Sequence, residues 1–105
     1  KANIALYHVL NYPNPFTTNT RFMFEHNKPG VALEVKIEIF SVSGKVVKTI
    51  LKNINTTGYR VDDITWDGLD DYGDKIGKGV YIYRVTLNDD SGKKVSQYQK
   101  LVLLN

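Results

Sequence analysis

The sequence predicts an all-β protein, an antiparallel β-sandwich of about seven short strands. Two observations indicate this class. Segments rich in alternating apolar and polar residues recur roughly every ten residues, and Gly, Asn, Asp or Pro separates each from the next. In addition, no stretch shows the apolar stripe of an amphipathic helix, in which apolar residues recur at helical spacing.

The N-terminal part holds two shorter strand candidates, residues 4–10 and 20–25, separated by the stiff stretch NYPNPF at residues 11–16. Its prolines exclude a helix interior and make a poor central strand, because each fixes φ near about −65° and lacks an amide proton. Each proline also pushes the residue before it towards an extended conformation. We expect a structural bend that leads the chain from a first edge strand into the sandwich, where Phe16 enters the core.

Residues 33–40, LEVKIEIF, give the clearest strand signal. Aliphatic residues fall on one side and charged residues, Glu38 among them, on the other, which is the period of a strand with one buried and one wet face. A turn at Ser43-Gly44 leads into a second apolar segment, residues 45–51. The two segments are therefore predicted to form a hairpin.

The next strand candidate is residues 59–66, and a loop with four glycines and four aspartates follows at residues 67–79. Clustered carboxylates are what calcium prefers, but this loop lacks the ligand spacing of an EF-hand. We interpret it as a long turn in which Asp caps backbone amides and Gly supplies positive φ. The weak metal candidates are Asp67, Asp70, Asp71 and Asp74, and we expect no metal and no cofactor.

The C-terminal part predicts a second hairpin, in which residues 80–87 and 95–104 are strands and residues 88–94 form the turn. Its last segment, KLVLLN, is almost continuously apolar. A loose apolar strand would be an aggregation hazard, so we expect this one to be paired inside a sheet between two neighbours.

These elements together are typical of an immunoglobulin-like sandwich without the cysteine pair of antibody domains. The chain of 105 residues suffices for one hydrophobic core, and its contents of apolar (42%) and charged (24%) residues are those of a globular protein. No apolar run reaches the roughly 20 residues of a membrane span. We expect residues 1–105 to be one domain cut from a longer protein, because Lys1 begins without an initiator Met or a signal peptide.

The sequence offers little catalytic chemistry. There is no cysteine, no serine lies in a G-x-S-x-G elbow, and His8 and His26 are far apart. We expect His26 to be a strand-end residue bonded to its loop, and His8 to be structural as well. The net charge of +3 is spread along the chain rather than gathered in a patch, so no nucleic-acid partner is expected.

A binding module is the alternative. Exposed tyrosines and Trp66 on one sheet face would make a carbohydrate-stacking platform. We favour a core role, in which Tyr81 and Tyr83 share the inner face of their strand while Arg84 and Thr86 face water. The residues that the platform would use are Tyr59, Trp66, Tyr72, Tyr81, Tyr83 and Tyr98.

Several motifs in order resemble the C-terminal sorting domain, or Por secretion tail, of proteins exported by the type IX secretion system of Bacteroidetes. They are NYPNPFTTNTRFMF, IEIFSVSGKVVKTI, TWDGLDDYGDKIGKGVYIYRV and the final KLVLLN, and together they extend from about Val9 to Asn105. The same succession resembles the immunoglobulin-like domain of flagellar hook-capping proteins. FEHNKPG and WDGLDDYGDKIGKGVY look most like the C-terminus of that system's gingipain-like sortase family, which are cysteine peptidases.

The resemblance carries over to individual positions. The residues that match the motifs are Pro13, Asn14, Pro15 and Phe16, then Gly44 and Lys45, then Trp66, Asp67 and Gly68, then Gly79, Val80 and Tyr81, and finally Lys100, Leu101, Val102, Leu103 and Leu104. The family's final segment usually carries basic residues around its apolar run, whereas this chain ends in Asn105.

The resemblance implies a non-enzymatic sorting signal that the type IX machinery recognises through protein–protein contacts. Its parent would pass through the periplasm and reach the outer-membrane cell surface, with its peptidase site outside this chain. We expect neighbouring parent domains as further partners, and no direct membrane span. The alternative remains an accessory module that binds carbohydrate or a neighbouring domain, or a calcium-stabilised spacer.

Overall fold

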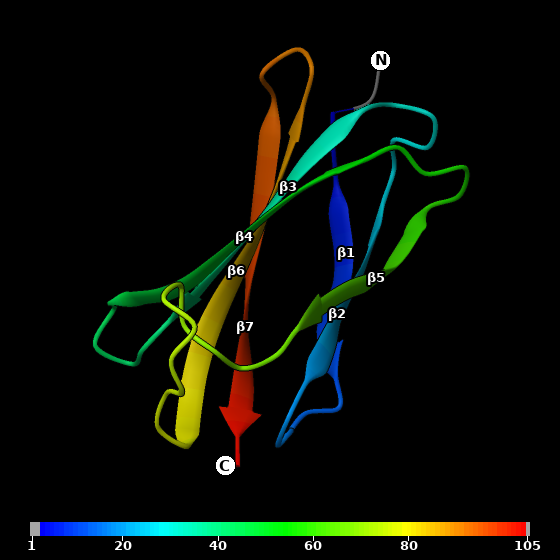
Figure 1. The fold of residues 1–105 in the computed structure, drawn as a ribbon. Helices are drawn as coiled ribbons and strands as arrows, with labels where there is room; N and C mark the ends of the chain where they lie inside the picture. Colours follow the sequence, from blue (N-terminus) through cyan, green and yellow to red (C-terminus); the bar gives the residue numbers. More distant parts are fainter. Residues whose placement is uncertain (1–2, 105) are drawn as a thin grey trace.

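The computed structural model describes residues 3–104, which form seven antiparallel strands in two facing layers (Figure 1). This confirms the predicted immunoglobulin-like sandwich. The strands are β1 (Leu6–Tyr12), β2 (Thr20–His26), β3 (Leu33–Phe40), β4 (Val46–Ile54), β5 (Arg60–Trp66), β6 (Gly79–Asp89) and β7 (Lys94–Leu103).

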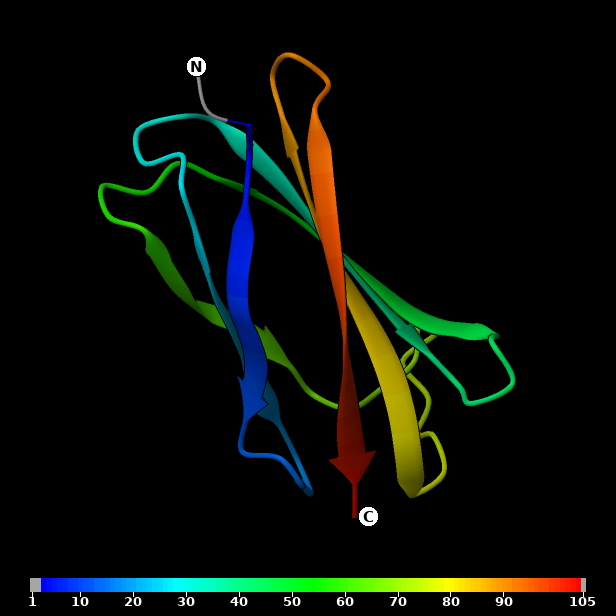
Figure 2. The ribbon, with the colours of Figure 1, turned by 180° about the vertical axis from the view of Figure 1, so that it is seen from behind.

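One sheet has the order β1-β2-β5 and the other the order β4-β3-β6-β7. The predicted hairpins β3–β4 and β6–β7 are both present, and β3 also pairs with β6. Seen from behind, β1 runs beside β7 along one side of the sandwich (Figure 2). Two amide side chains join these edges, because Gln97 and Gln99 donate from Nε2 to the carbonyls of Leu6 and Val9 at 2.6 and 2.9 Å.

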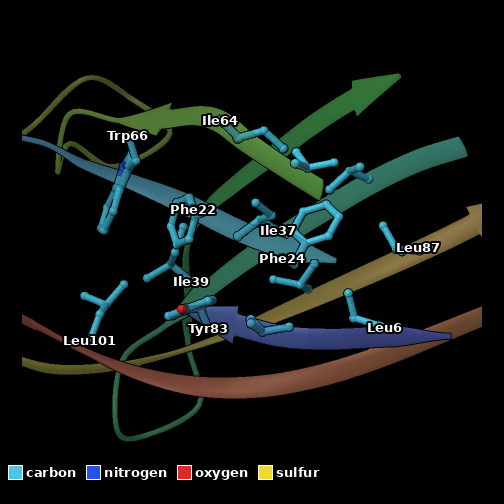
Figure 3. Close-up of a cluster of buried hydrophobic side chains, with 14 of the residues drawn as sticks. Leu6, Phe22, Phe24, Ile37, Ile39, Ile64, Trp66, Tyr83, Leu87 and Leu101 are labelled. Carbon is cyan, nitrogen blue, oxygen red and sulfur yellow. The ribbon is translucent and has the colours of Figure 1, made fainter. Parts of the chain in front are cut away.

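The apolar faces of the strands meet in one core between the sheets (Figure 3). Phe22 lies edge-on to the ring of Tyr83, with 4.9 Å between the ring centroids. Tyr81 and Tyr83 lie in this core, as the alternation of β6 predicted. The largest fully buried side chains include Phe16, Phe22, Phe24, Ile37, Ile39, Ile64, Tyr83, Leu87 and Leu101.

Glu38 departs from the expected wet face, because only 9% of its surface is exposed. Arg84 of the neighbouring strand donates from Nε and Nη2 to Glu38 Oε1 at 3.0 and 2.6 Å. The Arg84 guanidinium also lies 5.7 Å from the Phe40 ring centroid and 5.6 Å from that of Tyr98. Arg84 therefore covers the Glu38 carboxylate on the outer face of the sheet. A prediction from the alternation of apolar and polar residues alone cannot include this contact between strands.

The expectation for the last strand was partly wrong. β7 is paired and its apolar end is buried, but it is an edge strand with only β6 as a full neighbour. The next strand in space, β1, hydrogen-bonds to β2 in the other sheet. The second side of β7 is covered locally instead, by a single parallel bridge between Phe16 and Leu103.

The NYPNPF stretch makes the predicted bend. β1 is an edge strand that continues through Asn11 and Tyr12, and the chain then turns at two prolines, both preceded by cis peptide bonds. Phe16 is buried, with 2% of its surface exposed. The bend thus carries the chain across to the edge of β7 at Phe16, before the chain returns to the first sheet as β2.

Candidate functional site

The NYPNPF loop hydrogen-bonds to the outer edge of β7. Asn14 donates from Nδ2 to the Lys100 carbonyl at 3.1 Å, and its Oδ1 accepts the Val102 N–H at 3.0 Å. The backbone of Phe16 continues the ladder, since its N–H donates to the Val102 carbonyl at 3.0 Å and its carbonyl accepts the Leu104 N–H at 2.8 Å. The Asn14 side chain and the Phe16 backbone therefore make the hydrogen bonds that a neighbouring strand would otherwise make with this end of β7.

A buried polar cluster holds Asn14 in place. Asn14 Nδ2 also donates to Asn11 Oδ1 at 3.1 Å, and Asn11 Nδ2 donates to Thr20 Oγ1 at 3.0 Å. The Thr20 hydroxyl donates in turn to the Pro13 carbonyl at 2.8 Å. Asn11 and Thr20 are both buried, so the orientation of the Asn14 amide is fixed from within the fold.

Phe16 fills the space beneath this ladder. Its ring centroid lies 5.6 Å from that of Trp66, whose indole Nε1 donates to the Leu69 carbonyl at 2.9 Å. Gly68 follows Trp66 with a φ of +77°, and a Cβ there would lie 3.4 Å from the Phe16 ring. The WDG motif therefore places Trp66 against the Phe16 ring, and a Cβ at Gly68, whose positive φ favours glycine, would lie within ordinary van der Waals range of the same ring.

The GVY motif pairs with the last residues of the chain. Gly79, Val80 and Tyr81 lie opposite Leu103, Val102 and Leu101 in the β6–β7 ladder. The Tyr81 hydroxyl donates to the Gly77 carbonyl, and burial raises the pKa of this tyrosine. β6 is thereby anchored to the end of the preceding loop.

Four of the five sequence motifs therefore meet at one place, which we call the motif end. It comprises residues 13–16, 66–68, 79–81 and 100–104. The fifth motif does not join it, because Gly44 and Lys45 belong to the β3–β4 turn. There the Gly44 N–H donates to the Ser41 carbonyl, and the Ser41 N–H donates to the Lys45 carbonyl.

The aspartate loop uses its carboxylates as backbone caps. Asp70 Oδ1 accepts the N–H groups of Tyr72 and Asp74, both at 2.9 Å, and Asp67 Oδ1 accepts that of Leu69 at 3.1 Å. Asp71 reaches the edge of β4: its Oδ1 accepts the Thr49 N–H at 3.1 Å and its own N–H donates to the Val47 carbonyl at 3.1 Å.

The Asp67–Asp74 carboxylates are thus dispersed along the loop. Within residues 3–104, no three His, Cys, Asp or Glu side chains are grouped so that they could hold a metal ion.

His26 has the position that the sequence predicted, at the end of β2 and bonded to loops. Its Nδ1 accepts the Lys28 N–H at 3.0 Å, so Nε2 carries the proton and donates to Thr56 Oγ1 at 2.8 Å. Burial lowers the pKa of His26. His8 differs, because it lies exposed on a β1 bulge with a φ of +54° and Nδ1 3.1 Å from Glu25 Oε1.

The tyrosines do not form the platform that a carbohydrate module would use. Tyr81, Tyr83 and Trp66 are buried. Tyr59, Tyr72 and Tyr98 are exposed, but they come from the turn before β5, the aspartate loop and β7 respectively. The part of the chain that the structure describes also holds no helix of the length and apolarity that a membrane crossing requires.

Sequence reasoning missed the supporting residues of the motif end, Asn11 and Thr20, and the glutamines that tie β7 to β1. Asn11 stands inside the NYPNPF motif, two residues before Pro13, and a polar residue at that place in the motif was a usable signal. Gln97 and Gln99 alternate with outward residues on a strand whose other inward positions are apolar. That polar break in the apolar face was the only available hint.

Comparisons with known proteins agree on the fold. The family model of the FlgD Ig-like domain matches residues 11–92. The structure is similar to part of dimeric latent PorU from Porphyromonas gingivalis, with a TM-score of 0.84 and 30% sequence identity over 99% of this chain. This chain spans only 10% of that PorU chain.

Two further structures share the fold alone. FlgD from Xanthomonas campestris has a TM-score of 0.64 at 21% identity, covering 95% of this chain and 69% of its own. CopC from Methylosinus trichosporium OB3b has a TM-score of 0.51 at 15% identity, covering 91% and 93% respectively. A search of curated protein sequences finds no match.

Proposed function

This chain belongs to the family of FlgD Ig-like domains, and we propose that it serves as a sorting domain that the type IX secretion machinery recognises for export across the outer membrane. It does so without catalysis of its own, through contacts between proteins. Its destination is the cell surface, after transit through the periplasm.

The meeting of the sequence motifs at the motif end carries this proposal. NYPNPF and KLVLL lie at opposite ends of the sequence, yet Asn14 and Phe16 hydrogen-bond directly to residues 100–104. A signal that a machine reads only after folding needs its parts in one rigid place. The motif end supplies such a place, with Trp66 and Gly68 packed beneath it.

The likeness to PorU supports a gingipain-like parent. The FEHNKPG and WDGLDDYGDKIGKGVY stretches resemble a gingipain-like sortase family, and the structural likeness to part of PorU covers 99% of this chain. We therefore propose that the parent is a cysteine peptidase of that family and that its nucleophile lies outside these residues, since the chain has no cysteine.

The recognition surface in this proposal is the last hairpin, residues 80–104, together with the loop that covers its end. β7 is an edge strand, and edge strands offer main-chain groups to a partner. The exposed side chains along it also include Lys94, Tyr98 and Lys100.

Fusing residues 1–105 behind a periplasmic reporter in a type IX-competent host tests the proposal. We expect the reporter at the cell surface. The FlgD Ig-like domain in the same fusion is the matched control, since it has the same fold, and it should leave the reporter in the periplasm. If the reporter stays in the periplasm with both domains, residues 1–105 are not a sufficient sorting signal. If both domains deliver the reporter to the surface, the secretion machinery recognises the fold itself and not the motif end.

The rival binding module has little support, because the aromatic residues that it needs are buried or dispersed. A spacer role remains compatible with the fold, and the same reporter experiment separates it from a sorting role. A spacer leaves the reporter in the periplasm whatever the state of the motif end.

A further inference from the structure

β7 has an open edge over half of its length. Its register with β6 is regular from Lys94 to Leu103, so alternate residues direct their N–H and C=O groups away from β6. Val102 is one of these, because its N–H and C=O bond to Asn14 and Phe16. The same alternation directs the backbone groups of Ser96 and Tyr98 outward, and no hydrogen bond within residues 3–104 reaches them.

Other edges of the sandwich are partly protected. Asp71 blocks β4 at Val47 and Thr49. β1 is bulged around His8, and the side chains of Gln97 and Gln99 occupy two of its carbonyls. The pairing of β5 with β2 shifts register midway along the strand. Bulges and covering contacts are the usual protection of edge strands. Residues 94–98 of β7 contain no bulge, and although the Gln97 side chain bonds to β1, the outward backbone groups of Ser96 and Tyr98 have no covering contact among residues 3–104.

The charge on this edge has one sign. Residues 91–105 contain Lys93, Lys94 and Lys100 but no Asp or Glu. Lys94 and Lys100 are exposed on either side of Ser96 and Tyr98. The turn before β7 carries two carboxylates, Asp89 and Asp90. Asp89 Oδ1 accepts the N–H groups of Ser91 and Lys93 within the hairpin, whereas Asp90 is exposed at the tip of the turn, outside the strand edge.

We infer that residues 94–98 of β7 bind an extended acidic segment of another protein, which adds to the sheet as a further strand beside Ser96 and Tyr98. Main-chain hydrogen bonds supply the attachment, and carboxylates of the added strand face Lys94 and Lys100. This inference rests on the proposed function, because it names the kind of segment that the secretion machinery presents to the last hairpin.

A second copy of this chain is a poorer occupant. Antiparallel pairing of two β7 edges brings together two strands whose only charged residues are lysines. In the register that places Ser96 opposite Tyr98, Lys94 also lies opposite Lys100. Like charges directly opposite each other destabilise a strand pair. The edge therefore discriminates against its own copy and in favour of a segment with carboxylates.

The test measures binding of a short acetylated and amidated peptide, TEVEVET, to the isotope-labelled chain at low salt. We expect amide NMR shifts centred on Ser96 and Tyr98, with Val102 unaffected because the loop covers it. The matched peptide TKVKVKT should bind at least about threefold more weakly, since each cross-strand charge pair changes sign. Equal affinity for both peptides, or shifts centred on another strand, overturns the inference.

Two variants locate the contact. Ser96→Pro removes an outward N–H that β6 does not use, and we expect it to weaken binding of TEVEVET about fivefold, the loss of one main-chain hydrogen bond. Ser96→Ala keeps that N–H and should bind like the parent chain. Lys94→Glu leaves the backbone alone and should weaken binding by about threefold or more. Unchanged affinity in both Ser96→Pro and Lys94→Glu contradicts the inference.

Failure here is distinguishable from failure of the sorting proposal. If the wild-type chain delivers the reporter to the cell surface but does not bind TEVEVET, the sorting role stands and the inference that residues 94–98 bind an acidic segment is wrong. If peptide binds while the reporter stays in the periplasm, the binding edge stands without the sorting role. Concentration-dependent shifts at Ser96 without peptide, together with a doubled mass, identify a second copy as the occupant and overturn the inference.

Discussion

The side chain of Asn14 is hydrogen-bonded to the backbone on both sides of Leu101, as a peptide group of a neighbouring strand would be. Its Oδ1 accepts the Val102 N–H at 3.0 Å, while its Nδ2 donates to the carbonyl two residues earlier, at Lys100. Phe16 adds the next two bonds of the same ladder. The end of an edge strand is therefore closed by a loop rather than by a strand.

Replacing Asn14 by Ala should destabilise the domain. The change removes both bonds to β7 and the bond to Asn11, and water can reach part of this site, so we expect a loss of about 1–2 kcal/mol in the free energy of unfolding. Urea unfolding measures it. Amide exchange at Val102 should also accelerate in this variant.

Asn53→Ala is the matched control for Asn14→Ala. Asn53 is an exposed asparagine on the edge strand β4, and no side-chain hydrogen bond involves it among residues 3–104. We expect a change within about 0.5 kcal/mol, as is usual for surface positions. Equal losses in the two variants would show that the Asn14 ladder contributes no specific stability.

The strands could be predicted because their signals are local. Alternation over residues 33–40 and the turn at Ser43-Gly44 specify a hairpin without any long-range information. The prediction of Phe16 as a core residue was equally sound, because a large aromatic after two prolines has few other places to go. The boundaries differ by a few residues: β1, for example, extends to Tyr12 rather than stopping at Leu10.

The edge position of β7 could not be predicted, because it depends on which strands pair across the whole chain. An apolar run such as KLVLL is compatible with a central strand or with an edge strand whose outer side is covered. Here Asn14 and Phe16 provide that cover from the other end of the sequence. The burial of Glu38 could not be predicted for a similar reason, since it depends on Arg84 in another strand.

Tyr83→Phe should leave stability unchanged or increase it. The Tyr83 hydroxyl is buried without a protein hydrogen-bond partner among the described residues, and burial raises the pKa of this tyrosine far above its usual range. Removing an unpartnered buried hydroxyl relieves its desolvation cost, so we expect a gain of up to about 1 kcal/mol in thermal or urea unfolding.

Tyr81→Phe provides the matched comparison on the same face of β6. Its hydroxyl donates to the Gly77 carbonyl, so its removal should cost about 1 kcal/mol. Opposite signs for the two variants test the assignment of these hydroxyls. If Tyr83→Phe costs as much as Tyr81→Phe, the Tyr83 hydroxyl has a bonding partner after all.

Removal of divalent metal should not change the melting temperature. In the aspartate loop, Asp67, Asp70 and Asp71 each accept a backbone N–H with a carboxylate oxygen. These carboxylates therefore cap backbone amides and are not arranged as ligands of a metal ion. Melting curves with calcium and with chelator should therefore coincide. A higher midpoint with calcium, abolished by Asp70→Asn, would instead identify a calcium-stabilised spacer.

Stability should fall as the pH drops below about 6.5 because His26 is buried as a neutral ring. Its Nδ1 accepts the Lys28 N–H, and a proton there would break that bond and place a charge in a desolvated site. Burial lowers the pKa of folded His26 from 6.5, so the unfolded chain binds the proton first as the pH falls.

The contribution of His26 is complete above the unfolded pKa of 6.5 and is lost between that value and the lower folded pKa. The slope for one group is at most about 1.4 kcal/mol per pH unit. Urea unfolding at several pH values should show this loss in the wild type and in His8→Gln, because His8 is exposed. In His26→Gln the amide can satisfy both the Lys28 N–H and Thr56, so the loss near pH 6 should vanish. A His26→Gln variant that retains the wild-type slope would assign the pH dependence to other groups.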